Sequence, residues 1–176
     1  MATEGDRMTR WQGVVGADHQ LFWVGVEDWT QFDVTLPDYG LSIPLLWPPP
    51  GRGGAYVFTK VHTDLVGVEI EYHDERPVLG LDGWEDVDLI VVDCTEGDLC
   101  VLPLGGGGDF FDEIVPGPGT FTVRCTARGR DAADIEVSED PPLELYRFDI
   151  WPAAADDSNR TLKQTSECSR GVRLNR

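Results

Sequence analysis

The apolar residues of this chain recur in short runs that glycine and proline interrupt, and this pattern constrains the fold more than any other. No segment keeps apolar residues at i, i+3 and i+4 over three helical turns. The runs lie roughly ten residues apart, which is typical of antiparallel β-proteins. The predicted strands span residues 20–26, 32–36, 41–47, 56–62, 66–72, 85–94, 99–104, 120–128 and 143–151. The pattern predicts an all-β protein, a two-sheet antiparallel β-sandwich of about eight or nine strands.

Alternation within the strands indicates which side chains face the core. Residues 66–72 place Val66, Val68 and Ile70 on one face and two glutamates on the other. Residues 120–128 alternate most clearly. Their predicted inward set is Phe121, Val123, Cys125 and Ala127, and their outward set is Thr120, Thr122, Arg124, Thr126 and Arg128. Such alternation is expected where one sheet face is buried.

We expect one domain over residues 11–152, followed by a loosely held tail over residues 153–176, where the composition changes to Ala, Asp, Ser and scattered Arg. The first ten residues are polar, and no run of about 18 apolar residues occurs, so a soluble cytoplasmic protein is expected.

The four cysteines form no CxxC pair and are expected to be reduced in the cytoplasm. A Cys94–Cys100 hairpin disulfide is the alternative.

The charge of the chain is unevenly distributed. The net charge is -18. Residues 11–123 contain 20 Asp and Glu against three basic residues, Arg52, Lys60 and Arg76. A strongly negative surface attracts cationic partners and repels nucleic acid and anionic membranes. We therefore expect a basic protein partner, no direct nucleic acid binding and no membrane binding. Acidity that serves solubility alone is the alternative, although such surfaces usually intersperse the two signs.

Carboxylates at loops and strand ends are the candidate partner-binding residues, because such positions can present a surface. They are Asp82, Glu85, Asp86, Asp88, Glu96, Asp98, Asp109 and Asp112. Asp86 and Asp88 begin a predicted strand and are expected to lie in solvent. Arg124, Arg128 and Arg130 form a basic cluster that we expect to pair with carboxylates on a neighbouring strand.

No motif indicates catalysis or a bound cofactor. The three histidines lack the spacing of a metal-binding motif, and residues 82–88 lack the spacing of an EF-hand calcium loop. The four glycines at 105–108 are followed by acids rather than by Lys-Ser/Thr, which disfavours phosphate binding. No GxSxG motif is present. We therefore expect a protein without enzymatic activity, cofactor or metal, although a pair of catalytic carboxylates is left open.

Two stretches carry a resemblance to known families. Residues 116–124 (PGPGTFTVR), 127–131 (ARGRD), 144–146 (ELY) and 150–153 (IWPA) are similar to segments of small uncharacterised bacterial β-proteins. Residues 19–24 (HQLFWV) and the Pro-Gly-x-Gly-Thr-Phe approach to a late strand resemble the competence protein J family. The second resemblance implies a small acidic cytoplasmic protein that binds and inhibits a nuclease.

The sequence thus favours a non-enzymatic acidic binding protein, an inhibitor or immunity protein for a cationic partner such as a nuclease. Carboxylates would occupy the groove that a nuclease lines with Lys and Arg for phosphate. The alternative is a β-sandwich that binds a small molecule or glycan, because several tryptophans could stack on a ligand. They are Trp23, Trp29, Trp47, Trp84 and Trp151.

Overall fold

The fold is taken from a computed structural model, which describes residues 10–28, 30, 42–78, 80–95, 99–105, 107–133, 140–172 and 174. The predicted strand at 32–36, Trp29, Glu96 and Asp98 lie outside the described residues. No helix in the described part of the chain is long and apolar enough to cross a membrane.

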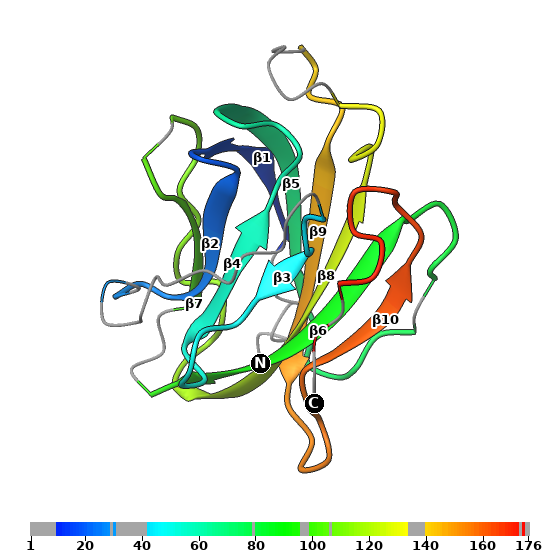
Figure 1. Ribbon diagram of the computed structural model, residues 1–176. Coiled ribbons are helices and arrows are strands. Elements are labelled where there is room, and N and C mark those ends of the chain that lie inside the picture. The colour runs from blue at the N-terminus through cyan, green and yellow to red at the C-terminus, as the bar shows by residue number, and fades with distance from the viewer. Residues whose placement is uncertain are drawn as a thin grey trace, which may run out of the picture.

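The described residues form ten strands in two sheets (Figure 1). The strands are β1 (Arg10–Ala17), β2 (Leu21–Val26), β3 (Leu46–Trp47), β4 (Gly54–Phe58), β5 (Asp64–Tyr72), β6 (Asp86–Cys94), β7 (Leu99–Pro103), β8 (Gly119–Arg128), β9 (Leu145–Pro152) and β10 (Arg160–Gln164). The six-stranded sheet has the order β1-β5-β9-β8-β6-β10, and the four-stranded sheet has the order β3-β4-β2-β7. The predicted all-β sandwich is confirmed.

One strand pair departs from the antiparallel pattern. β5 and β9 run parallel, from Gly67 opposite Leu145 to Tyr72 opposite Ile150, whereas every other named pair is antiparallel. Three further strands separate β5 from β9 along the chain, so this pairing depends on long-range order that local alternation does not encode.

The core lies between the two sheets. Val66, Val68 and Ile70 of β5 are fully buried there, as their alternation predicts. Phe22 of β2 meets the edge-on rings of Tyr146 and Phe148 of β9, with centroids 5.4 and 6.1 Å away. Edge-to-face aromatic pairs add to the stabilisation that burial of their area provides. These contacts hold one sheet against the other.

Residues 107–115 close the sandwich along one side. Gly108 forms an antiparallel β-bridge with Val15 of β1, which is an edge strand of the six-stranded sheet. Phe111 forms another with Val101 of β7, which is an edge strand of the four-stranded sheet. Gly108 has a φ of 100°, and a Cβ at this position would lie 2.6 Å from the carbonyl oxygen of Val14. Glycine is therefore needed for the close approach. One segment pairs with an edge of each sheet by backbone hydrogen bonds.

The described residues 160–172 pack against the sandwich, so the expectation of a loosely held tail is wrong for this part of the C-terminal segment. β10 pairs with β6 and supplies the last strand of the six-stranded sheet. Beyond β10, Ser166 and Ser169 are buried, and the Ile43 amide donates a 2.6 Å hydrogen bond to the Cys168 carbonyl. The polar composition misled the prediction because these side chains find their partners in segments distant along the chain.

We predict that deletion of residues 159–176 lowers the urea midpoint of unfolding substantially. The deletion removes β10 from β6 and takes away two buried serines that bind Asp86. Urea denaturation followed by tryptophan fluorescence measures the effect. An unchanged midpoint would restore the interpretation of this segment as a loose tail.

Candidate functional site

The carboxylates predicted to bind a partner do not form one cluster. Asp82 and Glu85 precede β6, on the side of the sandwich where β10 lies. Asp82 is exposed, and Glu85 is half-buried, with one carboxylate oxygen accepting a 3.1 Å hydrogen bond from the Arg130 amide. Asp82 thus presents its charge to solvent, whereas Glu85 also supports the neighbouring turn.

Asp109 and Asp112 lie at the opposite side, in the segment that joins β1 to β7. The Asp109 carboxylate accepts a 2.9 Å hydrogen bond from the Val14 amide, which attaches the segment to β1. Asp112 and its neighbour Glu113 are exposed, and neither carboxylate has a hydrogen bond or ion pair with another described residue. Between the two aspartates Phe110 is 47% exposed. An apolar ring flanked by acids therefore stands on this edge.

Asp86 and Asp88 are buried, so the expectation that they lie in solvent is wrong. They are 1% and 4% exposed. The register of β6 against β8 places them opposite Ala127 and Cys125, whose side chains face the core. Both aspartates therefore lie on the inner face of β6. Their position at the start of a strand suggested solvent, but segments from elsewhere in the chain cover this end of β6.

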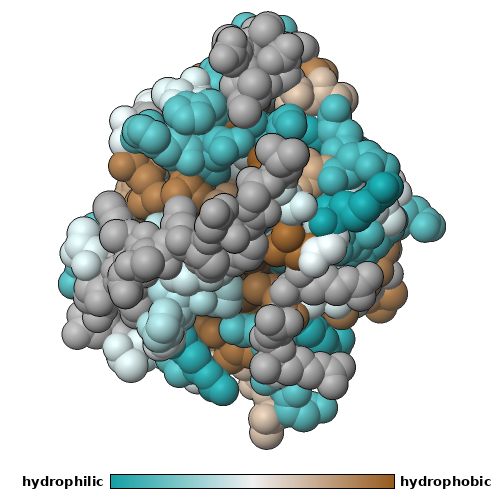
Figure 2. Space-filling view, in the orientation of Figure 1, coloured by the Kyte–Doolittle hydropathy of each residue, from teal (hydrophilic) through white to brown (hydrophobic). Residues whose placement is uncertain are grey.

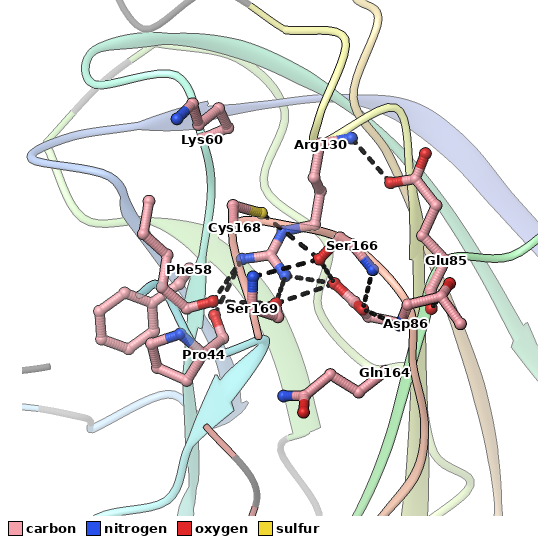
Figure 3. A network of polar contacts seen from close by, with 12 residues as sticks. Pro44, Phe58, Lys60, Glu85, Asp86, Arg130, Gln164, Ser166, Cys168 and Ser169 are labelled. Carbon is pink, nitrogen blue, oxygen red and sulfur yellow. Dashed lines mark hydrogen bonds and ion pairs between the residues drawn. The ribbon is translucent and has the colours of Figure 1, made fainter. Parts of the chain in front are cut away.

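Arg130 is the centre of the polar network that covers it (Figure 3). Its guanidinium forms a 2.6 Å ion pair with Asp86 and donates to the carbonyl oxygens of Ile43 and Pro44 at 3.1 and 3.0 Å. Ser166 and Ser169 donate to the same Asp86 oxygen at 2.5 and 2.9 Å. The network joins β6, the turn after β8, the approach to β3 and the residues after β10.

The ionisation of Asp86 follows from these partners. Burial alone would raise the pKa of its carboxyl, but the hydrogen bonds from Ser166 and the charge of Arg130 outweigh burial, so the pKa is lowered. The pair is thus a charged ion pair in the interior. A buried ion pair is not necessarily stabilising in itself, but the loss of one partner leaves an uncompensated charge. Its role here is to hold the sheet edges together.

Asp88 lies beside this network without its own arginine. Its carboxylate accepts a 3.3 Å hydrogen bond from the Leu46 amide of β3, and Thr161 of β10 also donates to it. Burial raises the pKa of this carboxyl to about 7, because these two hydrogen bonds only partly offset the loss of water. Asp88 therefore changes charge near neutral pH.

A second ionic cluster lies on the outer face of the six-stranded sheet. The Asp149 carboxylate forms ion pairs with the guanidinium groups of Arg124 at 2.6 Å and Arg147 at 2.8 Å. The Nε2 atom of His73 lies 2.9 Å from the same carboxylate. Arg147 also reaches Glu71 at 2.8 Å. The predicted pairing of Arg124 with a carboxylate on a neighbouring strand is confirmed. Ligand atoms of Glu71, His73 and Asp149 lie within 4.8 Å of one another, but two guanidinium groups already supply the positive charge that a metal would bring.

The tryptophans give little support to a stacking site. Trp23 and Trp151 are 0% and 2% exposed. Trp47 stacks on Tyr56, and Arg128 lies over Trp84, 5.2 Å from the ring centroid. Figure 2 shows both hydrophobic and hydrophilic residues on the face seen in Figure 1. All four cysteines are buried, and none is in a disulfide, as the reduced state requires.

Comparison with solved structures identifies the fold. The crystal structure of ComJ from Bacillus subtilis, an inhibitor of the DNA-degrading activity of NucA, matches with a TM-score of 0.57 at 12% identity, over 84% of this chain and 100% of that chain. The product of crocagin biosynthetic gene J matches with a TM-score of 0.48 at 12% identity, over 85% of this chain and 100% of that chain. No protein-family model matches the sequence, and a search among curated proteins finds no match.

The chain is thus a β-sandwich protein with a ComJ-like fold. The resemblance to the competence protein J family is confirmed as a distant one, at the level of the fold.

We predict that Arg130→Met lowers the free energy of unfolding by about 3–5 kcal/mol, because Asp86 then remains buried without its cation. The double variant Asp86→Leu/Arg130→Met should lose less than the sum of the two single variants, since both charges leave together. The matched control is Arg170→Met, which breaks the exposed Arg170–Glu167 pair and should change stability by less than about 1 kcal/mol. Equal effects of Arg130→Met and Arg170→Met in urea denaturation would contradict this assignment.

We predict that Asp88→Asn changes the pH dependence of stability. The folded protein holds a proton on Asp88 between the ordinary pKa of 3.8 and about 7, so this group favours folding below pH 4 and loses that contribution as pH rises through 7. The free energy of unfolding of Asp88→Asn minus that of the parent should therefore grow from pH 3.8 to about pH 7 and stay constant at higher pH. Glu144, whose pKa burial also raises, is common to both proteins. Asp82→Asn is the exposed control, and the same pH profile in both variants would refute the prediction.

Proposed function

We propose that this chain is a non-enzymatic binding protein that inhibits a cationic protein partner, a nuclease. Its likeness of fold to ComJ over the whole of that chain is the observation that carries the proposal. The neighbour is itself an inhibitor of DNA degradation, and the present chain has the sandwich on which such a binding surface can be built. A cytoplasmic location is part of the same proposal.

The distribution of charge supports a cationic partner. Two of the arginines, Arg124 and Arg130, are buried and paired with Asp149 and Asp86, so they contribute little positive potential outside. Several acids remain exposed, among them Asp82, Asp109 and Asp112. A nuclease lines its groove with Lys and Arg to neutralise phosphates. Carboxylates fixed on a rigid sandwich would occupy those positions and prevent DNA from entering.

We assign the contact to the edge formed by residues 107–115. It combines the exposed Phe110 ring with the carboxylates of Asp109, Asp112 and Glu113. Binding hot spots typically combine a central aromatic anchor with a polar rim. Backbone bridges to β1 and β7 hold the segment, so little conformational entropy would be lost on binding. Asp82 and Glu85 lie on the other side of the sandwich, and Glu96 and Asp98 stay candidates outside the described residues.

A depletion experiment tests the function. The purified chain is immobilised, a native lysate of the source cells is passed over it at low salt, and DNA-degrading activity is measured before and after. We expect the activity to be removed at low salt and recovered in a high-salt eluate, because electrostatic association weakens with ionic strength. The recovered nuclease should then be inhibited by added chain in a purified DNA cleavage assay. Undiminished nuclease activity in the flow-through would exclude the proposal.

We predict that charge reversal on the assigned edge weakens binding of that nuclease at least tenfold. The variant is Asp112→Arg/Glu113→Arg, and the expected loss lies in both the association rate and its salt dependence. Asp74→Arg/Glu75→Arg is the matched control, since it reverses another adjacent, exposed acidic pair with the same change in net charge. Surface plasmon resonance at two salt concentrations measures both. Equal losses would mean that net charge alone, and not this edge, directs the interaction.

A further inference from the structure

The turn between β1 and β2 is held in a strained conformation. The backbone groups of Asp18 and Leu21 exchange two hydrogen bonds, at 2.9 and 3.0 Å, around His19 and Gln20. These two residues have φ angles of 50° and 67°. Two-residue turns with positive φ at both positions strongly prefer Asn-Gly or Asp-Gly, because a larger side chain costs energy there. Strain of this kind is most often retained where the side chain has a function.

The strained turn brings His19 against His62. The two imidazole rings lie 5.3 Å apart between centroids, with an interplanar angle of 59°. Three hydrogen bonds fix the turn to the loop that carries His62: Gln20 amide to His62 carbonyl at 2.7 Å, Thr59 amide to Gln20 carbonyl at 2.9 Å, and Gln20 side chain to Lys60 carbonyl at 3.2 Å. The pair of rings is thus positioned by the backbone of both segments.

Each ring has one nitrogen engaged by an oxygen. Nδ1 of His19 lies 3.0 Å from the Asp18 carboxylate, and Nδ1 of His62 lies 3.0 Å from the Thr63 hydroxyl. The first contact fixes the proton on Nδ1 and leaves Nε2 of His19 as an electron-pair donor. A histidine that binds a metal usually has such an oxygen partner on its other nitrogen. Both rings have this arrangement.

The spacing of the rings fits one shared ion. Zinc binds imidazole nitrogen at about 2.0–2.1 Å in tetrahedral geometry, which places two ligating ring centres about 5 Å apart. The observed 5.3 Å agrees with that separation. The register of β1 and β5 places Asp64 opposite Ala17, so two carboxylates, Asp18 and Asp64, flank the same end of the sandwich. Their charge favours a cation, and both histidines are exposed, so water can complete the coordination.

We propose that His19 and His62 form a binding site for a divalent transition-metal ion of the class that prefers imidazole, represented by Zn²⁺. The site shares no residue with the edge assigned to the partner and does not depend on the proposed function. It also differs from the cluster of Glu71, His73 and Asp149, in which arginine side chains supply the positive charge. The ion would connect the β1–β2 turn with the loop after β4.

Calorimetric titration of the tag-free full chain with Zn²⁺ tests the proposal. The chain has only three histidines, and its four cysteines are buried, so few other ligands compete. We expect one ion per chain. His19→Asn and His62→Asn should each weaken binding at least tenfold, and the double variant should lose little more than either single one. His73→Asn is the matched control and should bind as the parent does.

A stability measurement separates a metal ligand from a structural residue. Asparagine accepts positive φ more readily than histidine, so His19→Asn should leave the metal-free thermal midpoint unchanged or raise it while it weakens Zn²⁺ binding. Addition of Zn²⁺ should raise the midpoint of the parent and of His73→Asn, but not that of His19→Asn. Absence of binding to the parent, full binding by the double variant, or loss of binding in His73→Asn would each overturn the proposal.

Discussion

The ion pair between Arg130 and Asp86 is the interaction on which one side of the sandwich depends. A two-sheet sandwich has four sheet edges, and each presents unpaired backbone groups unless something covers it. On the side of β1 and β7, a single segment bridges both edges by backbone hydrogen bonds. On the side of β3 and β10, a buried guanidinium binds a carboxylate from one sheet and two carbonyl oxygens beside the other. The side of β3 and β10 is therefore closed by the bonds of one buried arginine in addition to the backbone hydrogen bond between Ile43 and Cys168.

This arrangement also changes how the negative charge of the chain is distributed. Asp86 and Asp149 are neutralised by arginines inside the protein or beneath its surface, so they take no part in the external field. Asp88 adds no charge while it is protonated. The exposed acids among the predicted candidates are divided between the two sides of the sandwich, and in the described part of the chain those near Phe110 combine charge with an exposed aromatic ring. Total charge is thus a poor guide to where a partner would bind.

Local alternation predicted most of the sheets. In β5 the buried and outward residues follow the sequence pattern, because one face is covered and the period of two is preserved. In β8 the predicted inward residues are buried, but Thr122, Arg124 and Thr126 of the predicted outward set are buried as well. The sequence EDVDL at the start of β6 has the same alternation of acidic and apolar residues, yet there the acids face inward. The partners of Asp86 are Arg130 and the two serines after β10, and no local pattern in the sequence indicates contacts with such distant residues.

The same long-range order limits the candidate site. Loop positions correctly indicated that Asp82, Asp109 and Asp112 are exposed, but they gave no information on which of them are neighbours. The spacing of the histidines in the sequence also gave no signal of the contact between His19 and His62, which lie in two different loops. The sequence also gave no signal of the positive φ angles of His19 and Gln20.

The position of β10 in the sheet has a consequence for synthesis of the chain. β6 pairs with β8 on one side and β10 on the other, and β7, β8 and β9 all precede β10 along the chain. While the polypeptide is being made, the β10 side of β6 stays an open edge with apolar residues until the last strand arrives. Nascent chains with such open edges are prone to pair with one another. The two aspartates at the start of β6 remain hydrated and charged during that interval, and their mutual repulsion between neighbouring nascent chains would protect the edge until Arg130 and the serines enclose them.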